Sequence, residues 1–200
     1  MRKTTSLMLT LLILITLVLH NFNKNDEEQT SETSLININE NIIDQYLNVP
    51  VYYNTNISLP FHYSHDGYPY GIRWQCVEFI KRFYYDAFNH AMPNVYGHAV
   101  DFYDPHLIHA SYNSDRGMYQ YQNNQNTKPK INDLIVFNGT NNNPYGHVAI
   151  ITAVNENSIE IIQQNSGFNS RDELSLISDR NNHKVIHPYM EVLGWLRLVE

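Results

Sequence analysis

A single cysteine stands at the start of a stretch whose apolar residues repeat with the period of a helix. After Cys76, large apolar side chains recur every three or four residues, at Val77, Ile80, Phe83, Tyr84, Ala87 and Phe88. This spacing predicts an amphipathic helix over residues 74–89 with one buried face. Cys76 then lies at the helix N-terminus, where unpaired N–H groups and the helix dipole favour a thiolate. The position favours a nucleophile, and the alternative is a small, buried and inert apolar residue.

A second informative stretch begins at a histidine. Residues 145–154 form a nearly continuous apolar run from His147, residues 155–157 are a polar turn, and residues 158–165 resume an apolar strand. This pattern predicts a β-hairpin, in which the start of the first strand lies beside the end of the second. We expect an amide side chain at that strand end to accept the Nδ1–H of His147 and to leave Nε2 facing the thiolate. A nucleophile, a base and an orienting group in this arrangement are typical of acyl transfer.

Four ordered segments carry a family resemblance. They are the run from Trp74 to Phe79, the run from Gly146 to Thr152, the pair Gln164-Asn165, and the run from Leu193 to Trp195. Together they resemble a CHAP domain, a cysteine- and histidine-dependent amidohydrolase or peptidase. They are most similar to the amidase domain of the glutathionylspermidine synthetase/amidases. The resemblance covers about residues 50–200.

The resemblance implies an α+β, papain-like (NlpC-type) fold, with a nucleophile helix packed on an antiparallel β-sheet. It implies Cys76 as nucleophile, His147 as base, and no metal or cofactor. The family has a glutamate where this chain has Gln163, so Gln163 would orient the histidine as an amide. An amide there is costly in serine proteases, whereas papain-like cysteine enzymes use an asparagine. We therefore expect a thiol amidohydrolase of full or reduced activity, and the alternative is an inactive domain that serves as a binding module.

The composition of the chain excludes several classes of partner and binding site. The formal charge of −7, from 13 basic and 20 acidic residues, argues against nucleic-acid binding, which usually needs a basic face. The single cysteine excludes an internal disulfide and a cysteine-based zinc site. We expect a monomer that acts on a small peptide amide or on peptidoglycan. The motifs favour the first substrate, and the N-terminal segment favours the second.

The N-terminal segment has the pattern of an export signal. Arg2 and Lys3 precede a 13-residue apolar run over residues 7–19, which predicts a signal peptide or an uncleaved membrane anchor in residues 1–19. Residues 20–34 are polar and acidic, which predicts a disordered spacer. The CHAP domain would then occupy residues 35–200, in a secreted, periplasmic or membrane-anchored protein with the domain outside the cytoplasm.

The remaining segments are less informative. Residues 35–47 predict a short helix, and residues 48–72 an irregular approach to the cysteine. Strands are expected from residue 133 to 137 and from residue 192 to 199. Polar loops are expected over residues 113–131 and 168–188, since both segments are rich in polar residues.

Several polar residues need a separate interpretation. His62 with His65, and His183 with His187, have spacings that suit a metal, yet both pairs lack the helix and carboxylate of a metal motif. Asp133 is an alternative acid for a catalytic triad, but its place at a strand start favours a turn residue. Glu78, two positions after Cys76, is expected to have a structural role or to contribute charge at the helix start.

Overall fold

The computed structural model describes residues 41–55 and 59–199. The predicted signal segment and the spacer, residues 1–34, therefore lie outside the described residues. In chain order the elements are β1 (Ile42–Tyr46), β2 (Val49–Tyr52), β3 (Phe61–Tyr63), β4 (Pro69–Ile72), α2 (Cys76–Phe88), the 3₁₀ helix η1 (Val100–Phe102), β5 (Ser111–Asn113), β6 (Met118–Gln122), β7 (Leu134–Phe137), β8 (His147–Val154), β9 (Ser158–Ile162), β10 (Arg171–Asp179), β11 (Asn182–Ile186) and β12 (Val192–Arg197).

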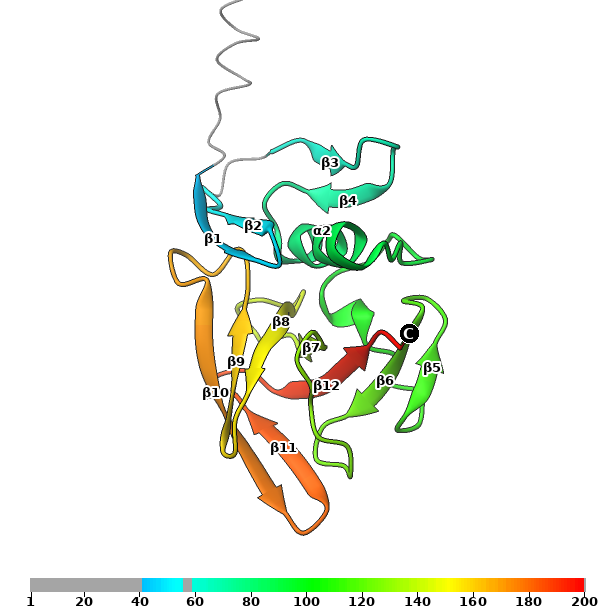
Figure 1. The fold of residues 1–200 in the computed structure, drawn as a ribbon, viewed down its shortest axis with the longest axis vertical. Helices are drawn as coiled ribbons and strands as arrows, with labels where there is room; N and C mark the ends of the chain where they lie inside the picture. Colours follow the sequence, from blue (N-terminus) through cyan, green and yellow to red (C-terminus); the bar gives the residue numbers. More distant parts are fainter. Residues whose placement is uncertain (1–40, 56–58, 200) are drawn as a thin grey trace, which may run out of the picture. The chain divides into compact units, whose positions relative to one another are not determined.

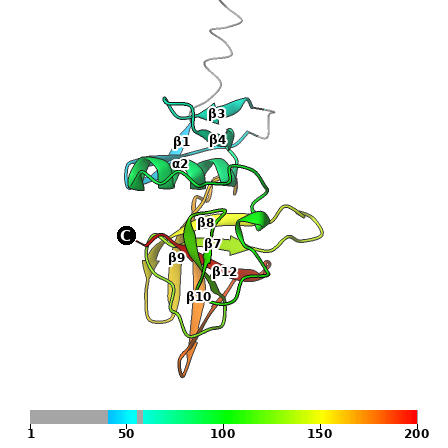
Figure 2. The ribbon, with the colours of Figure 1, turned by 90° about the vertical axis from the view of Figure 1, so that its right-hand side faces the viewer.

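One large sheet organises these elements. Its eight strands follow the order β11-β10-β9-β8-β7-β12-β6-β5, and every neighbouring pair is antiparallel. Helix α2 lies against this sheet, and the β3–β4 ribbon lies on the far side of the helix (Figure 1). The same layering is seen from the side in Figure 2. The helix over residues 74–89 is thus confirmed, beginning at Cys76 and ending at Phe88.

Two hydrophobic cores lie on opposite faces of the sheet. Alternate residues of β7 supply both, because Leu134 and Val136 face α2 while Ile135 and Phe137 face away. The first core adds Phe79, Ile80, Phe83 and Tyr84 from the predicted apolar face of the helix. Burying each such side chain stabilises the fold by about 2–3 kcal/mol. The helix that starts at Cys76 is therefore fixed firmly against the strands.

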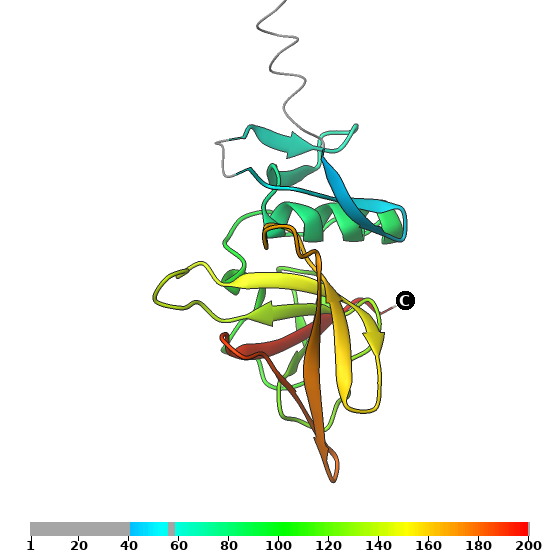
Figure 3. The same cartoon turned by 90° about the vertical axis from the view of Figure 1, so that its left-hand side faces the viewer.

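The second core is formed by buried residues of the strands, with Met190 of the β11–β12 connection packed against it. It gathers Leu174 and Leu176 of β10, Val185 of β11 and Trp195 of β12, all nearly inaccessible to water. The sheet therefore curls on the side away from the helix, with β9 and β10 seen edge to edge in Figure 3. Strands predominate, and α2 is the one α-helix in the described residues, so the expected α+β class is confirmed only in part.

Four segments differ from the sequence-based predictions. Within residues 35–47, the described part contains the strand β1 instead of a helix, and it pairs with β2. Residues 168–188 form the β10–β11 hairpin, because Leu174 and Leu176 alternate with exposed polar residues and bury one face. Residues 113–131, predicted as a loop, contain the whole of β6, and the predicted irregular region 48–72 contains β2, β3 and β4.

The other strands agree with the sequence pattern. β7 and β12 lie within residues 133–137 and 192–199, and β8 and β9 form the predicted hairpin around residues 155–157. In residues 41–55 and 59–199, no helix has the length and apolar character needed to cross a membrane.

Candidate active site

Cys76 is the first residue of α2 and is almost completely buried. Its side chain is 8% exposed, and Gln75 precedes it in an extended conformation. The sulfur accepts hydrogen bonds from the backbone N–H groups of Val148, Val77 and Cys76 itself. Burial nevertheless raises the pKa of the thiol to about 11, and those three hydrogen bonds offset only part of the rise. The expectation of a readily ionised thiol is therefore wrong, since burial outweighs the helix N-terminus.

His147 opens β8, one residue before the Val148 N–H that contacts the sulfur. Gly146, the residue before His147, adopts a φ of 73°. A Cβ at this position would lie only 2.6 Å from the carbonyl oxygen of Phe137, so the turn requires glycine. The ring is 9% exposed. Burial lowers the pKa of His147 to about 4, the Gln163 hydrogen bond opposes this shift, and the charge of His187 adds to it. The resting imidazole is therefore neutral at physiological pH.

Gln163 follows β9 directly and contacts His147. Its Oε1 lies 2.8 Å from Nε2 of the ring. Strands β8 and β9 are antiparallel, so the strand start and strand end meet as the hairpin predicted. The expected ring nitrogen is wrong, however, because Gln163 contacts Nε2 and leaves Nδ1 for the thiol. With Nε2 carrying the proton donated to Gln163, Nδ1 is unprotonated and can act as the base.

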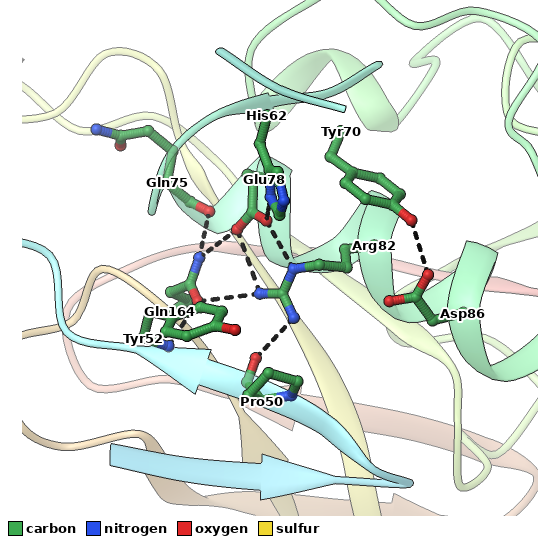
Figure 4. Close-up of polar contacts among 9 residues, drawn as sticks. All are labelled: Pro50, Tyr52, His62, Tyr70, Gln75, Glu78, Arg82, Asp86 and Gln164. Carbon is green, nitrogen blue, oxygen red and sulfur yellow. Dashed lines mark hydrogen bonds and ion pairs between the residues drawn. The ribbon is translucent and has the colours of Figure 1, made fainter. Parts of the chain in front are cut away.

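A buried ion-pair network joins the nucleophile helix to the strand end that carries Gln163 (Figure 4). Glu78 is fully buried and accepts hydrogen bonds from Arg82 at 2.6 Å and from Gln164 at 2.7 Å. Nδ1 of His62 lies 2.8 Å from the same carboxylate. These hydrogen bonds, with the ionic attraction of Arg82, hold the pKa of Glu78 below its usual value although burial, the largest effect, raises it. The predicted structural role of Glu78 is thus observed.

Gln164 and Asn165 attach the strand end to the residue before the cysteine. Nε2 of Gln164 donates to the carbonyl oxygen of Gln75 at 3.0 Å as well as to Glu78. Nδ2 of Asn165 donates to the side-chain Oε1 of Gln75 at 2.7 Å. Three consecutive residues, 163–165, therefore fix His147 and the start of α2 relative to each other. The sequence showed this pattern only as the Gln164-Asn165 segment of the resemblance, without a role for either residue.

Cys76 and His147 share one cleft of about 480 Å³. Its walls come from the β3–β4 ribbon, the start of α2, and the segments around residues 95–99 and 143–147. The lining residues are Phe61, Gly71, Ile72, Gln75, Cys76, Val77, Lys81, Val95, Tyr96, Gly97, His98, Ala99, Asn143, Tyr145, Gly146, His147 and Asn165. The cleft is mostly apolar, with a few polar groups close to the thiol, as substrate pockets usually are.

The other candidate residues lie elsewhere. Asp133 forms an ion pair with Arg197 at 2.7 Å and also accepts the Lys130 N–H, so its structural interpretation is confirmed. His62 contacts Glu78, while Nδ1 of His183 lies 3.0 Å from the Ser178 hydroxyl. Among the described residues no group of three His, Cys, Asp or Glu side chains could hold a metal ion.

Comparison with known proteins agrees with the motifs. The family model of the CHAP domain matches residues 64–165, a span that contains Cys76, His147 and Gln163. The chain belongs to the CHAP domain family. Membership indicates a hydrolase that acts on amide bonds.

One curated protein and one solved structure are each similar to part of this chain. Glutathionylspermidine synthase of Crithidia fasciculata is 28% identical over 101 residues, which is 49% of this chain and 14% of that protein. The chain thus matches a small part of that relative's length. The structure titled "The crystal structure of Ly7917" aligns with a TM-score of 0.36 and 18% identity, over 62% of this chain and 53% of that one.

Proposed function

We propose that this CHAP domain is a thiol-dependent amidohydrolase in which Cys76 is the nucleophile and His147 the general base. The observation that carries the proposal is the constellation at one cleft: a cysteine at a helix start, a neutral histidine beside it, and an amide that fixes the ring. This is the nucleophile, base and orienting group of a papain-like site.

The proposed reaction follows from the protonation states. As Sγ of Cys76 attacks the carbonyl carbon, the thiol proton passes to Nδ1 of His147 and the carbonyl oxygen gains the negative charge. We propose that the Cys76 backbone N–H, which faces the sulfur in the resting site, donates to that oxyanion as the charge moves to the carbonyl oxygen. The C–N bond then breaks, the imidazolium gives its proton to the leaving amine, and a thioester is left on the enzyme.

Hydrolysis reverses these roles. Nδ1 takes a proton from water, the hydroxide attacks the thioester carbonyl, and the C–S bond breaks to release a carboxylic acid. The departing sulfur recovers the proton from His147. Because burial keeps the resting pair neutral, the proton moves with the attack instead of before it. Gln163 is consistent with this order of proton transfer, since its amide oxygen accepts the Nε2–H of a neutral imidazole and adds no negative charge beside the ring.

Two substrate classes fit the proposal. The curated relative is named for glutathionylspermidine, which favours a small peptide amide of a polyamine. The apolar run at residues 7–19 favours an exported enzyme that cuts peptide bonds of peptidoglycan. Release of spermidine from glutathionylspermidine, measured beside release of new amino groups from purified peptidoglycan, separates the two. A Cys76→Ala variant provides the blank for both assays.

A binding module without catalysis is the second candidate, and the amide at Gln163 favours it. Such a module would bind one of these ligands by calorimetry with wild-type affinity in both Cys76→Ala and His147→Ala variants. It would release no amine from either ligand. An enzyme would release amine from one of them and lose that activity in both variants.

For location, we propose that the CHAP domain lies outside the cytoplasm, on the strength of Arg2, Lys3 and the apolar run that follows. Fractionation of cells that express the full chain tests this directly. Accessibility of the domain to protease added outside the cytoplasm would support it, and complete protection in intact cells would contradict it.

A further inference from the structure

Lys81 is the one lysine that lines the cleft among the residues described, and no arginine, aspartate or glutamate of those residues lines it. It lies five positions after Cys76 on α2, which places the two Cα atoms about 7.5 Å apart along the helix axis. The side chain is only 1% exposed. A buried lysine is rare unless it is paired with an opposite charge.

The partners of the Lys81 ammonium leave it incompletely satisfied. Nζ donates to the carbonyl oxygen of Val95 at 3.0 Å and lies 5.6 Å from the centre of the Tyr68 ring. An ammonium carries three N–H donors. In the described part of the chain no carboxylate forms an ion pair with it, and Glu78, one turn earlier, is engaged by Arg82 and Gln164.

The segment that Lys81 contacts has its own cation. Arg116 donates to the carbonyl oxygens of Asn94 at 2.7 Å, Tyr96 at 3.2 Å and Asp101 at 3.0 Å. Holding the backbone around residues 94–101 therefore does not need a second buried charge. Because Lys81 lines the cleft, a ligand that enters the cleft is within reach of its unfilled N–H donors.

We propose that Lys81 binds a carboxylate of the substrate, so that the cleft selects peptide amides with a free carboxylate near the scissile bond. This rests on the proposed function for its catalytic meaning. An ammonium forms a strong, charge-assisted hydrogen bond with a carboxylate when both are withdrawn from water. The apolar walls formed by Phe61, Ile72 and Val77 would withdraw them.

The environment of Lys81 also predicts how this selectivity depends on pH. Burial lowers the pKa of Lys81 to about 8, the positive charge of Arg116 lowers it further, and Glu78 opposes both. Tyr68 faces the ammonium as a neutral phenol, since burial raises its pKa above the usual value. The other titratable side chains on the described cleft wall are those of Cys76, Tyr96, His98, Tyr145 and His147. Lys81 is thus charged near neutral pH and loses its proton just above pH 8.

Alkylation of Cys76 tests the proposal without any amide cleavage. The reagents are the N-iodoacetyl derivatives of glycine, β-alanine and γ-aminobutyrate, each compared with its own carboxamide. We expect one spacer length at which the carboxylate labels Cys76 faster than the carboxamide, by about tenfold after correction for their rates with a free thiol. The ratio of the two labelling rates, carboxylate over carboxamide, should fall to about one in Lys81→Met. It should stay at the wild-type value in Lys184→Met, the control that removes an exposed lysine of β11.

The wild-type protein supplies an independent readout if Lys81→Met fails to fold. Both reagents attack the same thiol, so the ionisation of Cys76 cancels in the ratio, and the preference should disappear as the pH rises through 8. No preference at any spacer length, a preference retained in folded Lys81→Met, or a ratio constant up to pH 10 would overturn the proposal. Selective labelling by a protein that cleaves no amide would support carboxylate binding and refute the enzyme assignment alone.

Discussion

Nε2 of His147 lies 2.8 Å from Oε1 of Gln163, so a neutral amide orients the histidine at the position where the family has a glutamate. The contact fixes the tautomer and directs Nδ1 toward the cleft. It provides no negative charge to stabilise an imidazolium, which is consistent with a buried histidine whose pKa falls to about 4.

Replacing that amide is the sharpest test of its role. Gln163→Glu should keep the hydrogen bond, raise the pKa of His147 and favour the thiolate of Cys76, so the amidase rate should hold or rise. Gln163→Leu removes the acceptor and should lower the rate by about 10- to 100-fold, a part of what a positioned base contributes. Steady-state rates of both variants, with thermal melts as a folding control, measure this. Equal rates for Gln163→Leu and wild type would exclude Gln163 from the mechanism.

The buried Glu78–Gln164 network should matter for both stability and activity. Glu78→Gln leaves Arg82 buried without its ionic partner and should destabilise the fold by about 3–5 kcal/mol. Gln164→Leu removes the buried hydrogen bonds of Gln164 with Gln75, Glu78 and Tyr52 and should cost about 1–3 kcal/mol. Denaturant unfolding measures both losses.

Asp86→Asn is the matched control for this network. Asp86 lies on the same helix and accepts a hydrogen bond from Tyr70, but it is exposed, so the change should cost less than about 1 kcal/mol. A loss in Gln164→Leu no larger than in Asp86→Asn would show that the network does not hold the strand end to the helix.

Sequence pattern predicted the parts of this fold that repeat regularly. The three- and four-residue spacing after Cys76 identified α2, and the apolar runs on both sides of residues 155–157 identified the β8–β9 hairpin. That hairpin placed the segment Gln163 to Asn165 beside His147, and the family resemblance singled out Gln163, whose side chain makes the contact. The β10–β11 hairpin was predicted as a loop because most residues of β10 are polar and exposed. Only Leu174 and Leu176 of that strand are buried, which is too short an alternation to identify a strand.

The electrostatics of the site followed from features that the sequence does not display. The helix N-terminus argued for a low thiol pKa, but the depth of burial of Cys76 depends on how β8 packs over the helix start. The ring nitrogen that contacts Gln163 depends on the rotation of the imidazole, which no spacing specifies. His62 joins Glu78 only through tertiary packing, so its role had no sequence signal. Glu78 and Arg82 have the i, i+4 spacing of a helical ion pair, which is a sequence signal that our predictions left unused.

The buried histidine should make stability depend on pH. The pKa of His147 is about 4 in the folded state, below its ordinary value of 6.5, so the unfolded chain binds more protons between these values. Above pH 6.5 the neutral imidazole of His147 makes its full contribution to the free energy of unfolding. About 3 kcal/mol of that free energy should be lost as the pH falls through 4. Unfolding free energies measured from pH 7 to pH 4 should therefore fall less steeply in His147→Gln than in the wild type. Parallel curves would contradict the buried, neutral imidazole.

The predicted N-terminal segment should be dispensable for folding. The described residues, which begin at Asn41, already form two buried hydrophobic cores. A chain that starts near residue 35 should therefore be soluble and should unfold cooperatively in denaturant. Aggregation of every such truncation, with recovery only when residues 7–19 are restored, would show that the apolar run packs within the domain.

The central claim is that Cys76 is the nucleophile of an amide hydrolysis, and single-turnover mass spectrometry tests it most directly. A confirmed amide substrate mixed with the wild type and quenched in acid should give a chain heavier by the acyl group, attached to Cys76 and cleaved by hydroxylamine. Cys76→Ala should show neither the adduct nor release of the amine, while its melting temperature stays close to that of the wild type. Amine release by Cys76→Ala at the wild-type rate would contradict the account.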